Sequence, residues 1–180
     1  MNTKKHCASS NEPIRCAIYA RTATQPPNGN NSIEQQIEQC REAARERGWT
    51  VVENCVRADC GKSGTTIDQR TGLHDLMALA ATRPRPFNYL MCTSTDRLAR
   101  NLDTASAVIG SLTFNGVNLY FVSGDLDSAD PRFWGPVCAM VSQYQSFSEE
   151  LGTKNRRGKL RSKLAATENQ TAAVPAASTR

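Results

Sequence analysis

Four arginines and one aspartate are of the types, and at the spacing, that could bind a phosphate. Arg21 follows a short apolar run, and Arg70 begins a helical pattern. Arg97 and Arg100 lie three residues apart after another apolar run, with Asp96 beside them. The guanidinium group donates paired N–H groups that match phosphate oxygens. Taken singly, each arginine is more often a solvated surface residue, so the prediction of an anion site depends on their convergence.

The hydrophobic pattern predicts the elements that would bring these residues together. Apolar runs alternate with helical periodicity, which indicates an α/β fold with a mostly parallel sheet flanked by helices. Ligands bind beyond the carboxyl ends of the strands in such sheets. The predicted strands are 14–19, 50–56, 89–93 and 118–122. The predicted helices are 32–47, 70–81, 104–114 and 136–163, with a short helical turn at 96–101. The predicted loops are 24–31, 58–69 and 124–134.

The domain organisation follows from length and composition. The chain has 180 residues, of which 39% are hydrophobic, so it can bury one core. We expect a flexible N-terminus at 1–13 and a single α/β domain at 14–134. A long helix with a basic end follows at 135–164. The Ala/Thr/Pro-rich tail, 165–180, is expected to be disordered.

The net charge of +5 is concentrated near the end of the predicted long helix. Six basic residues and no acidic residue lie between positions 154 and 163, which leaves the rest of the chain at −1. Such a segment favours a polyanion as a partner. A solvated helix end is an equally good interpretation of the charge alone. The basic residues are Lys154, Arg156, Arg157, Lys159, Arg161 and Lys163.

The same long helix carries an apolar seam whose members step by three and four residues. This heptad spacing is suited to packing against another helix and predicts an oligomer. Packing against the sheet of the same chain is the alternative, since the seam spans barely two heptads. The seam consists of Val137, Met140, Tyr144, Phe147 and Leu151.

Several other functional classes are disfavoured. The seven cysteines are scattered, no Cys-x-x-Cys pair occurs and only two histidines are present, which argues against a zinc site or a disulfide framework and for the reducing cytoplasm. No apolar run reaches the length of a membrane span. Residues 60–63 imitate the end of a nucleotide-binding P-loop, but Val56 stands where that motif requires glycine. We therefore expect no metal, no nucleotide cofactor and no membrane partner.

Six short motifs in order resemble the resolvase/invertase family of serine recombinases, in its N-terminal catalytic domain. Residues 18–24, Ile-Tyr-Ala-Arg-Thr-Ala-Thr, are similar to the Tyr-Ala-Arg-Val-Ser-Thr motif of that family. The other five similar stretches are Ser-Ile-Glu-Gln-Gln at 32–36, Asp-Cys-Gly-Lys-Ser-Gly at 59–64, Arg-Thr-Gly-Leu at 70–73, Thr-Asp-Arg-Leu-Ala-Arg at 95–100 and Arg-Arg-Gly at 156–158.

The resemblance implies a reaction and a set of roles. In this family a serine attacks the DNA backbone to give a 5′-phosphoserine linkage and a free 3′-hydroxyl, and strands are exchanged within a tetramer without metal or nucleotide. Asp96 would orient an arginine or assist protonation of the leaving group. Gln36 and Tyr19 would support the pocket, although Tyr19 is equally readable as core and Gln36 as a solvated helix residue. The implied phosphate ligands are Arg21, Arg70, Arg97 and Arg100.

The sequence departs from the family at the nucleophile position, which is occupied by Ala23. A methyl group cannot attack phosphorus, and loss of a covalent nucleophile can remove about a million-fold of rate. Two functions stay open. One is a recombinase whose strand exchange is impaired. The other is a non-catalytic protein that binds DNA and forms homodimers, tetramers or mixed oligomers with an active recombinase.

Overall fold

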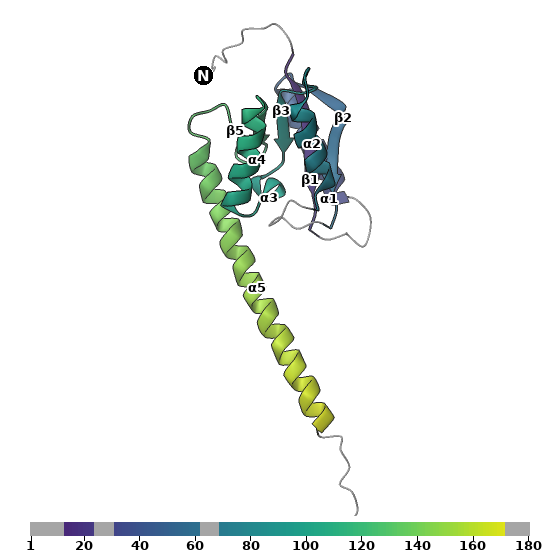
Figure 1. Cartoon of the computed structure of the whole chain (residues 1–180), viewed down its shortest axis with the longest axis vertical. Coiled ribbons are helices and arrows are strands. Elements are labelled where there is room, and N and C mark those ends of the chain that lie inside the picture. Colours follow the sequence, from purple (N-terminus) through teal and green to yellow (C-terminus); the bar gives the residue numbers. More distant parts are fainter. Residues whose placement is uncertain (1–12, 24–30, 62–68, 172–180) are drawn as a thin grey trace, which may run out of the picture.

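In the part of the chain that the structure describes, five strands form one sheet with the order β2-β1-β3-β4-β5, and five helices pack around it or extend from it (Figure 1). The computed structural model describes residues 13–23, 31–61 and 69–171. The strands are β1 (Arg15–Arg21), β2 (Thr50–Asp59), β3 (Tyr89–Cys92), β4 (Asn118–Phe121) and β5 (Leu126–Asp127). The helices are α1 (Asn31–Glu46), α2 (Thr71–Ala81), α3 (Thr95–Leu98), α4 (Leu102–Phe114) and α5 (Trp134–Thr171).

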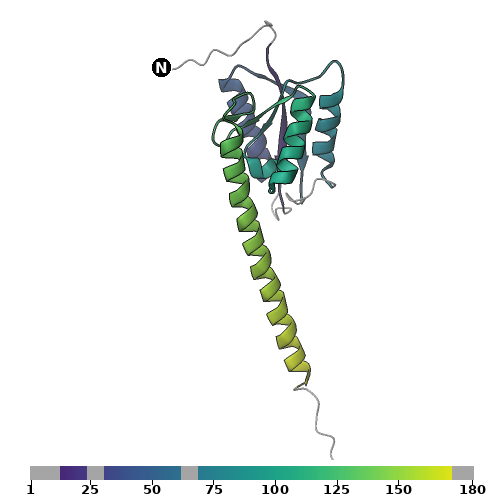
Figure 2. The same cartoon turned by 60° about the vertical axis from the view of Figure 1, so that its left-hand side comes forward.

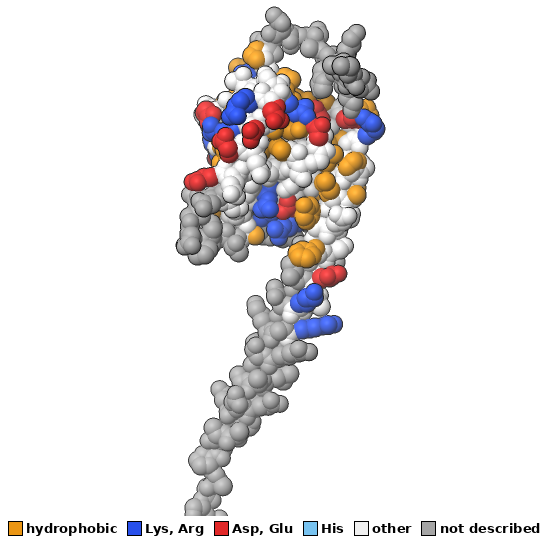
Figure 3. Space-filling view, turned by 180° about the vertical axis from the view of Figure 1, so that it is seen from behind, with side chains coloured by type: hydrophobic (Ala, Val, Ile, Leu, Met, Phe, Trp, Pro, Cys, Tyr) orange, Lys and Arg blue, Asp and Glu red, His pale blue; other side chains and the backbone are white. Residues whose placement is uncertain are grey.

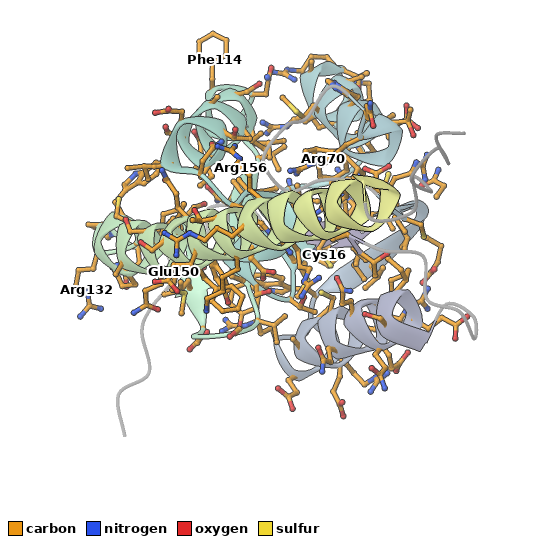
Figure 4. All side chains as sticks on the ribbon, turned by 90° about the horizontal axis from the view of Figure 1, so that it is seen from below. Cys16, Arg70, Phe114, Arg132, Glu150 and Arg156 are labelled. Carbon is orange, nitrogen blue, oxygen red and sulfur yellow. The ribbon has the colours of Figure 1, made fainter. Side chains whose placement is uncertain are left out.

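The sheet is covered on both faces, as the predicted α/β class requires. Seen from the end toward which α5 runs, α1 lies on one side of the sheet and α2 and α4 lie on the other (Figure 4). Strands β1 to β4 are parallel, so the predicted parallel sheet is confirmed. The short β5 pairs antiparallel with β4 and lies in the segment 124–134, which the sequence predicts to be loop throughout.

The central strand β1 is buried from Cys16 to Arg21. Its side chains alternate between two apolar clusters, as successive residues of a strand must. Cys16 and Ile18 pack with α1, whereas Ala17 and Tyr19 pack with α2 and α4. A strand that is paired on both edges and covered on both faces reads as a continuous apolar run, which is why the sequence reveals it.

Strands β1 and β2 continue further than their apolar runs suggest. Their parallel pairing reaches Arg21 opposite Asp59, so both residues belong to strand ends. The predicted loop 58–69 therefore begins later than expected, because backbone pairing with β1 carries β2 past its last apolar residue. Much of that loop, 62–68, and most of the predicted loop 24–31 lie outside the described residues.

Helix α5 begins on the core and then leaves it (Figures 1 and 2). Val137 of the predicted seam and the nearby Val141 are fully buried against the domain, whereas the seam residues Tyr144 and Phe147 are exposed. The predicted seam thus divides into a part that packs within the chain and a part that does not, and the side chain of Leu151 is outside the described side chains. Residues 165–171 are helical rather than disordered, and 1–12 and 172–180 lie outside the described residues.

The buried thiols between β1 and α1 predict a loss of stability in alkali. Burial raises the pKa of the Cys16 and Cys40 thiols from 9.0 to about 12, so the folded protein keeps protons that the unfolded chain releases. This stability is complete below pH 9 and is lost as the pH rises toward 12. We expect the free energy of unfolding to fall by roughly 1.4 kcal/mol per pH unit for each thiol.

Urea titrations of the parent protein and Cys40→Ala over this pH range measure the effect. The variant lacks the packing of the Cys40 side chain and is less stable at every pH. Above pH 9, however, its free energy of unfolding should fall less steeply with pH than that of the parent protein, by roughly 1.4 kcal/mol per pH unit. Identical slopes for both proteins would contradict the prediction.

Candidate active site

The carboxyl end of β1 is completed by a side-chain amide from α1. The Arg21 backbone N–H donates to Gln36 Oε1 at 3.1 Å, and the Arg21 carbonyl accepts from Gln36 Nε2 at 3.2 Å. Gln36 is buried and thus behaves as a substitute strand partner where β3 no longer pairs with β1. Its interpretation as a solvated helix residue is wrong, because its amide satisfies the buried strand end.

Two arginines turn inward and bind the backbone of α3. Arg21 donates from Nη2 to the carbonyl of Asp96 at 2.7 Å and from Nε to the carbonyl of Arg97 at 3.0 Å. Arg70, which precedes α2, donates from Nη1 to the carbonyl of Leu98. Both arginines are fully buried. Arg70 lies in the middle of the molecule, whereas Arg132 projects at its periphery (Figure 4).

The other two arginines lie nearer to solvent. Arg97 is half-buried, donates from Nη1 to the Arg21 carbonyl at 3.0 Å and forms an ion pair with Asp96 at 3.3 Å. Asp96 also accepts from the Ser94 hydroxyl, which fixes the carboxylate that orients Arg97. Arg100 is half-buried and donates no hydrogen bond to any residue that the structure describes. Basic side chains gather at this end of the domain, next to the departing α5 (Figure 3).

The other three guanidinium groups lie close enough to Arg21 to lower its pKa. The pKa of Arg21 is lowered from 12.5 to about 10, first by burial and then by the positive charges of Arg100, Arg70 and Arg97. Arg21 is still protonated at neutral pH. The structure therefore brings together the arginines that the sequence singled out, and their mutual repulsion makes the edge receptive to an anion.

Asp59 organises the second half of this edge, although we did not predict it as a site residue. Its carboxylate accepts from the backbone N–H groups of Gly72 at 3.1 Å and Leu73 at 3.2 Å, which satisfies the first turn of α2. It also accepts from the Tyr19 hydroxyl at 3.0 Å. Tyr19 is a core residue and a polar support at once, and burial together with the Asp59 charge raises its pKa.

The close approach of α2 to β2 depends on a glycine. A Cβ placed on Gly72 would lie 3.2 Å from the Arg57 Cβ and 3.3 Å from Asp59 Oδ1. The helix could not sit at this distance with a larger residue unless β2 moved. Gly72 therefore sets the start of α2, and with it the position of Arg70.

Ala23 is exposed two residues beyond Arg21, at the end of the described segment. Its side chain has no lone pair and no proton to lose, so it offers no nucleophile. The neighbouring Thr22 is buried, and its hydroxyl finds no hydrogen-bond partner among the described residues. Thr24 is outside the described residues.

A polar cleft of about 760 Å³ opens beside the arginines. One wall is α1, the floor is the loops that follow β3 and β4, and Tyr144 of α5 closes one side. Asp96, Arg97 and Gln36 line it, so part of the candidate site faces this opening.

The predicted basic segment lies on the part of α5 that extends beyond the domain. Lys154, Arg156 and Arg157 are exposed, and the side chains of Lys159, Arg161 and Lys163 are outside the described side chains. The structure does not bring this segment to the arginines at the sheet edge: it follows Tyr144 along the helix, away from the core (Figure 2).

Two further features are absent from the described residues. No cluster of three or more histidine, cysteine, aspartate or glutamate side chains is arranged to hold a metal ion there. Within the same ranges, no helix combines the length and the apolar character that a membrane crossing needs.

The chain belongs to the resolvase family. A parallel sheet whose carboxyl edge gathers arginines is joined here to a long helix, and the family model described as "Resolvase, N terminal domain" matches residues 16–170. No curated protein was found to match the chain.

Solved structures of recombinase catalytic domains share this fold. The N-terminal catalytic domain of TP901-1 integrase is 22% identical with a TM-score of 0.58, covering 76% of this chain and 98% of that one. A resolvase family site-specific recombinase from Streptococcus pneumoniae is 21% identical with a TM-score of 0.57, covering 86% and 99%. The C-terminal catalytic domain of ISC1926 TnpA, an IS607-like serine recombinase, is 28% identical with a TM-score of 0.51, covering 61% and 70%.

Replacing Asp59 tests whether it anchors α2. Asp59→Ala removes the acceptor for two backbone N–H groups and for the buried Tyr19 hydroxyl. We expect the free energy of unfolding to fall by about 2–4 kcal/mol in urea titration. The matched control is Asp75→Ala, because Asp75 is an exposed α2 residue that pairs with Arg57 at 3.5 Å. The control should cost under about 0.5 kcal/mol, and equal losses would show that Asp59 is no anchor.

Proposed function

We propose that this chain is a serine recombinase domain that binds a DNA backbone phosphate at the carboxyl edge of its sheet, and that Ala23 prevents it from cutting the strand. The observation that carries this proposal is the set of four guanidinium groups around α3, two of them fully buried and two nearer to solvent. One of the four, Arg21, lies two residues before Ala23. The DNA itself would supply the anion that offsets their repulsion.

The chemistry of strand cleavage explains why such a site is needed. Displacement at phosphorus proceeds in line, and negative charge spreads over the phosphate oxygens in the transition state. Fixed positive groups in a partly dry site stabilise that charge without reorganisation. Asp96, held by Ser94 and paired with Arg97, keeps one of these groups aligned. In this proposal the site retains the positive groups that would stabilise the transition state and lacks the attacking hydroxyl.

The exposed part of α5 supports a role in an assembly. Tyr144 and Phe147 present aromatic surface on a helix that has left its own core. Aromatic side chains of this kind bury large areas when two helices pack. We therefore propose a homodimer or tetramer, or a mixed oligomer in which this chain modulates an active recombinase. In the mixed form the chain would hold DNA while its partner cuts.

Restoring the hydroxyl tests the state of the site. We expect Ala23→Ser to form a covalent adduct with DNA, in which the serine oxygen bonds to the 5′-phosphate and the 3′-oxygen leaves as a hydroxyl. The parent protein should form none, because loss of the nucleophile costs about a million-fold in rate. The measurement is gel detection of protein-linked DNA from a pool of supercoiled plasmids with random inserts.

The control is Ala23→Ser combined with Arg97→Ala, which keeps the hydroxyl and removes one phosphate ligand, so its adduct should be strongly reduced. An adduct formed by the parent protein would contradict the proposed loss of cleavage. No adduct from Ala23→Ser would contradict the claim that only the nucleophile is missing.

The basic end of α5 should supply contacts that depend strongly on salt. Substituting Lys154, Arg156 and Arg157 together with alanine should lower the slope of log affinity against log salt by about 2.7, since each phosphate contact contributes about 0.9. Binding of a duplex of arbitrary sequence, followed by fluorescence anisotropy, measures this slope.

The control removes the same charge elsewhere: Arg41, Arg45 and Arg132 each lie beside a carboxylate of this chain. Their triple alanine variant should change the slope little. Equal effects of the two triple variants would favour the interpretation of the basic segment as a solvated helix end.

A further inference from the structure

A second group of arginines lies at the opposite edge of the sheet, where the parallel strands begin. Arg15 is the first residue of β1, and Arg83 and Arg85 lie in the segment that joins α2 to β3. We call these three the amino-edge arginines. Arg15 donates from Nη2 to the Arg85 carbonyl at 3.1 Å, which brings these two residues together. Because β1 has seven residues, this edge lies roughly 20 Å from Arg21, so one phosphate cannot contact both edges.

Among the residues that the structure describes, no carboxylate forms an ion pair with the amino-edge arginines. Other arginines on the surface of the domain have such partners: Arg41 pairs with Glu53 at 2.7 Å, and Arg132 pairs with Asp130 at 3.0 Å. The sequence has no acidic residue at 76–88, which leads from α2 into β3, or at 104–118, which leads from α4 into β4. The positive charge of this edge is therefore left for a ligand to neutralise.

The contacts of these arginines within the fold are made to backbone carbonyls. Arg85 donates from Nη1 to the carbonyl of Asn115, just beyond α4. Arg83 donates from Nη1 to the carbonyls of Ala80 at 3.3 Å and Thr82 at 2.8 Å, at the end of α2. A cation beside the C-terminus of a helix stabilises that helix, and this role accounts for one nitrogen of each group. The other two nitrogens of each guanidinium bind none of the described residues and are not buried, so they can bind a ligand.

The turn after α4 fixes the position of Arg85. A Cβ on Gly116 would overlap Arg85 Nη1 and lie 3.1 Å from its Cζ, so the guanidinium occupies the space that a side chain at position 116 would fill. Gly116 also has a φ of +74°, a conformation that residues with a side chain rarely adopt. The half-buried Arg85 is thus held in place before any ligand arrives.

An aromatic ring adjoins these charges. Phe114, the last residue of α4, is 91% exposed, and it directly precedes Asn115, whose carbonyl binds Arg85. The ring projects outward from the end of α4, away from the other helices (Figure 4). A ring with this exposure contributes little to the core of its own chain. Together with the neighbouring positive charge, it suits a ligand that carries both flat apolar groups and anions.

We propose that the amino edge binds single-stranded DNA, whose bases stack on Phe114 and whose phosphates contact the amino-edge arginines. Proteins that bind single strands without sequence preference combine aromatic platforms with a positively charged surface. In a duplex the bases stay stacked on one another, so a duplex could use the arginines but not the ring. An acidic peptide would likewise satisfy only the charge. The inference goes beyond the proposed function, which uses the opposite edge of the sheet.

Fluorine-19 NMR of the full chain, labelled with fluorophenylalanine, locates the contact. The Phe114 signal is assigned as the one that Phe114→Leu lacks. We expect an oligonucleotide of deoxythymidine to shift the Phe114 signal and to leave those of the buried Phe121 and Phe133 in place. A duplex of the same length and a polyglutamate peptide should shift it much less. A Phe114 signal that does not move with the single strand, or that moves as far with the duplex or the peptide, would overturn the inference.

Affinity measurements separate stacking from charge. Binding of the labelled oligonucleotide is followed by fluorescence anisotropy over a range of salt. Phe114→Ala and Phe114→Leu should lower the affinity by about tenfold without changing the salt slope, and Phe114→Trp should retain it. Arg83→Gln combined with Arg85→Gln should lower the slope by about 1.4, since each phosphate contact with a single strand contributes about 0.7.

The control for charge is Arg41→Gln combined with Arg132→Gln, which removes two arginines that pair with carboxylates and should change the slope little. Fluorescence of Trp49, which stacks on Tyr89 at 4.3 Å, checks that each variant is folded. The Phe114 variants change only an exposed side chain, so they test the inference even if the double arginine variant does not fold. Parent-like affinity of Phe114→Ala for the single strand, or equal affinities of Phe114→Leu and Phe114→Trp, would overturn the inference.

Discussion

The binding of the α3 carbonyls by two buried guanidinium groups is the constraint on which the functional edge depends. Burying a cation is costly unless its donors are satisfied, and a four-residue helix is unstable without outside partners. Hydrogen bonds from Arg21 and Arg70 to the carbonyls of α3 meet both needs, because the buried guanidinium groups gain acceptors and α3 gains donors. The ends of β1, α2 and α3 therefore become one unit, although the residues involved are far apart in the sequence.

A second set of polar contacts extends this unit through the sheet. Asp59, at the end of β2, binds the first turn of α2 and the Tyr19 hydroxyl of β1. Gln36 of α1 closes the other edge of β1 at Arg21. Most of these contacts are hydrogen bonds between a side chain and the backbone. They therefore fix the position of the main chain, which hydrogen bonds between two side chains would not do. The half-exposed Arg97 and Arg100 are held on a rigid support that reaches both faces of the sheet.

How much the sequence could predict depends on the range of the interactions. The apolar runs of β1 and β3 and the helical spacing of α2 and α4 are local signals, and they were sufficient for the parallel sheet and for the convergence of the arginines. The two residues of β5 are too few to show a period. Asp59 contacts a helix that begins beyond the following loop, so no local capping pattern reveals it. An arginine side chain can also turn toward solvent or toward backbone, and only the unsatisfied carbonyls of α3 decide which.

The buried and the more exposed arginines differ in what they imply about activity in a chain whose nucleophile position is alanine. Arg21 and Arg70 donate hydrogen bonds to backbone carbonyls of α3, so their presence is also explained by the fold of this edge. Arg100 is different, because it donates no hydrogen bond to the described residues and lies close enough to Arg21 to lower the pKa of that residue. Positive charges placed this close together repel one another, and a bound anion would offset that repulsion. The place of Arg100 at this edge therefore supports the proposal that the edge binds a phosphate, although Ala23 offers no nucleophile.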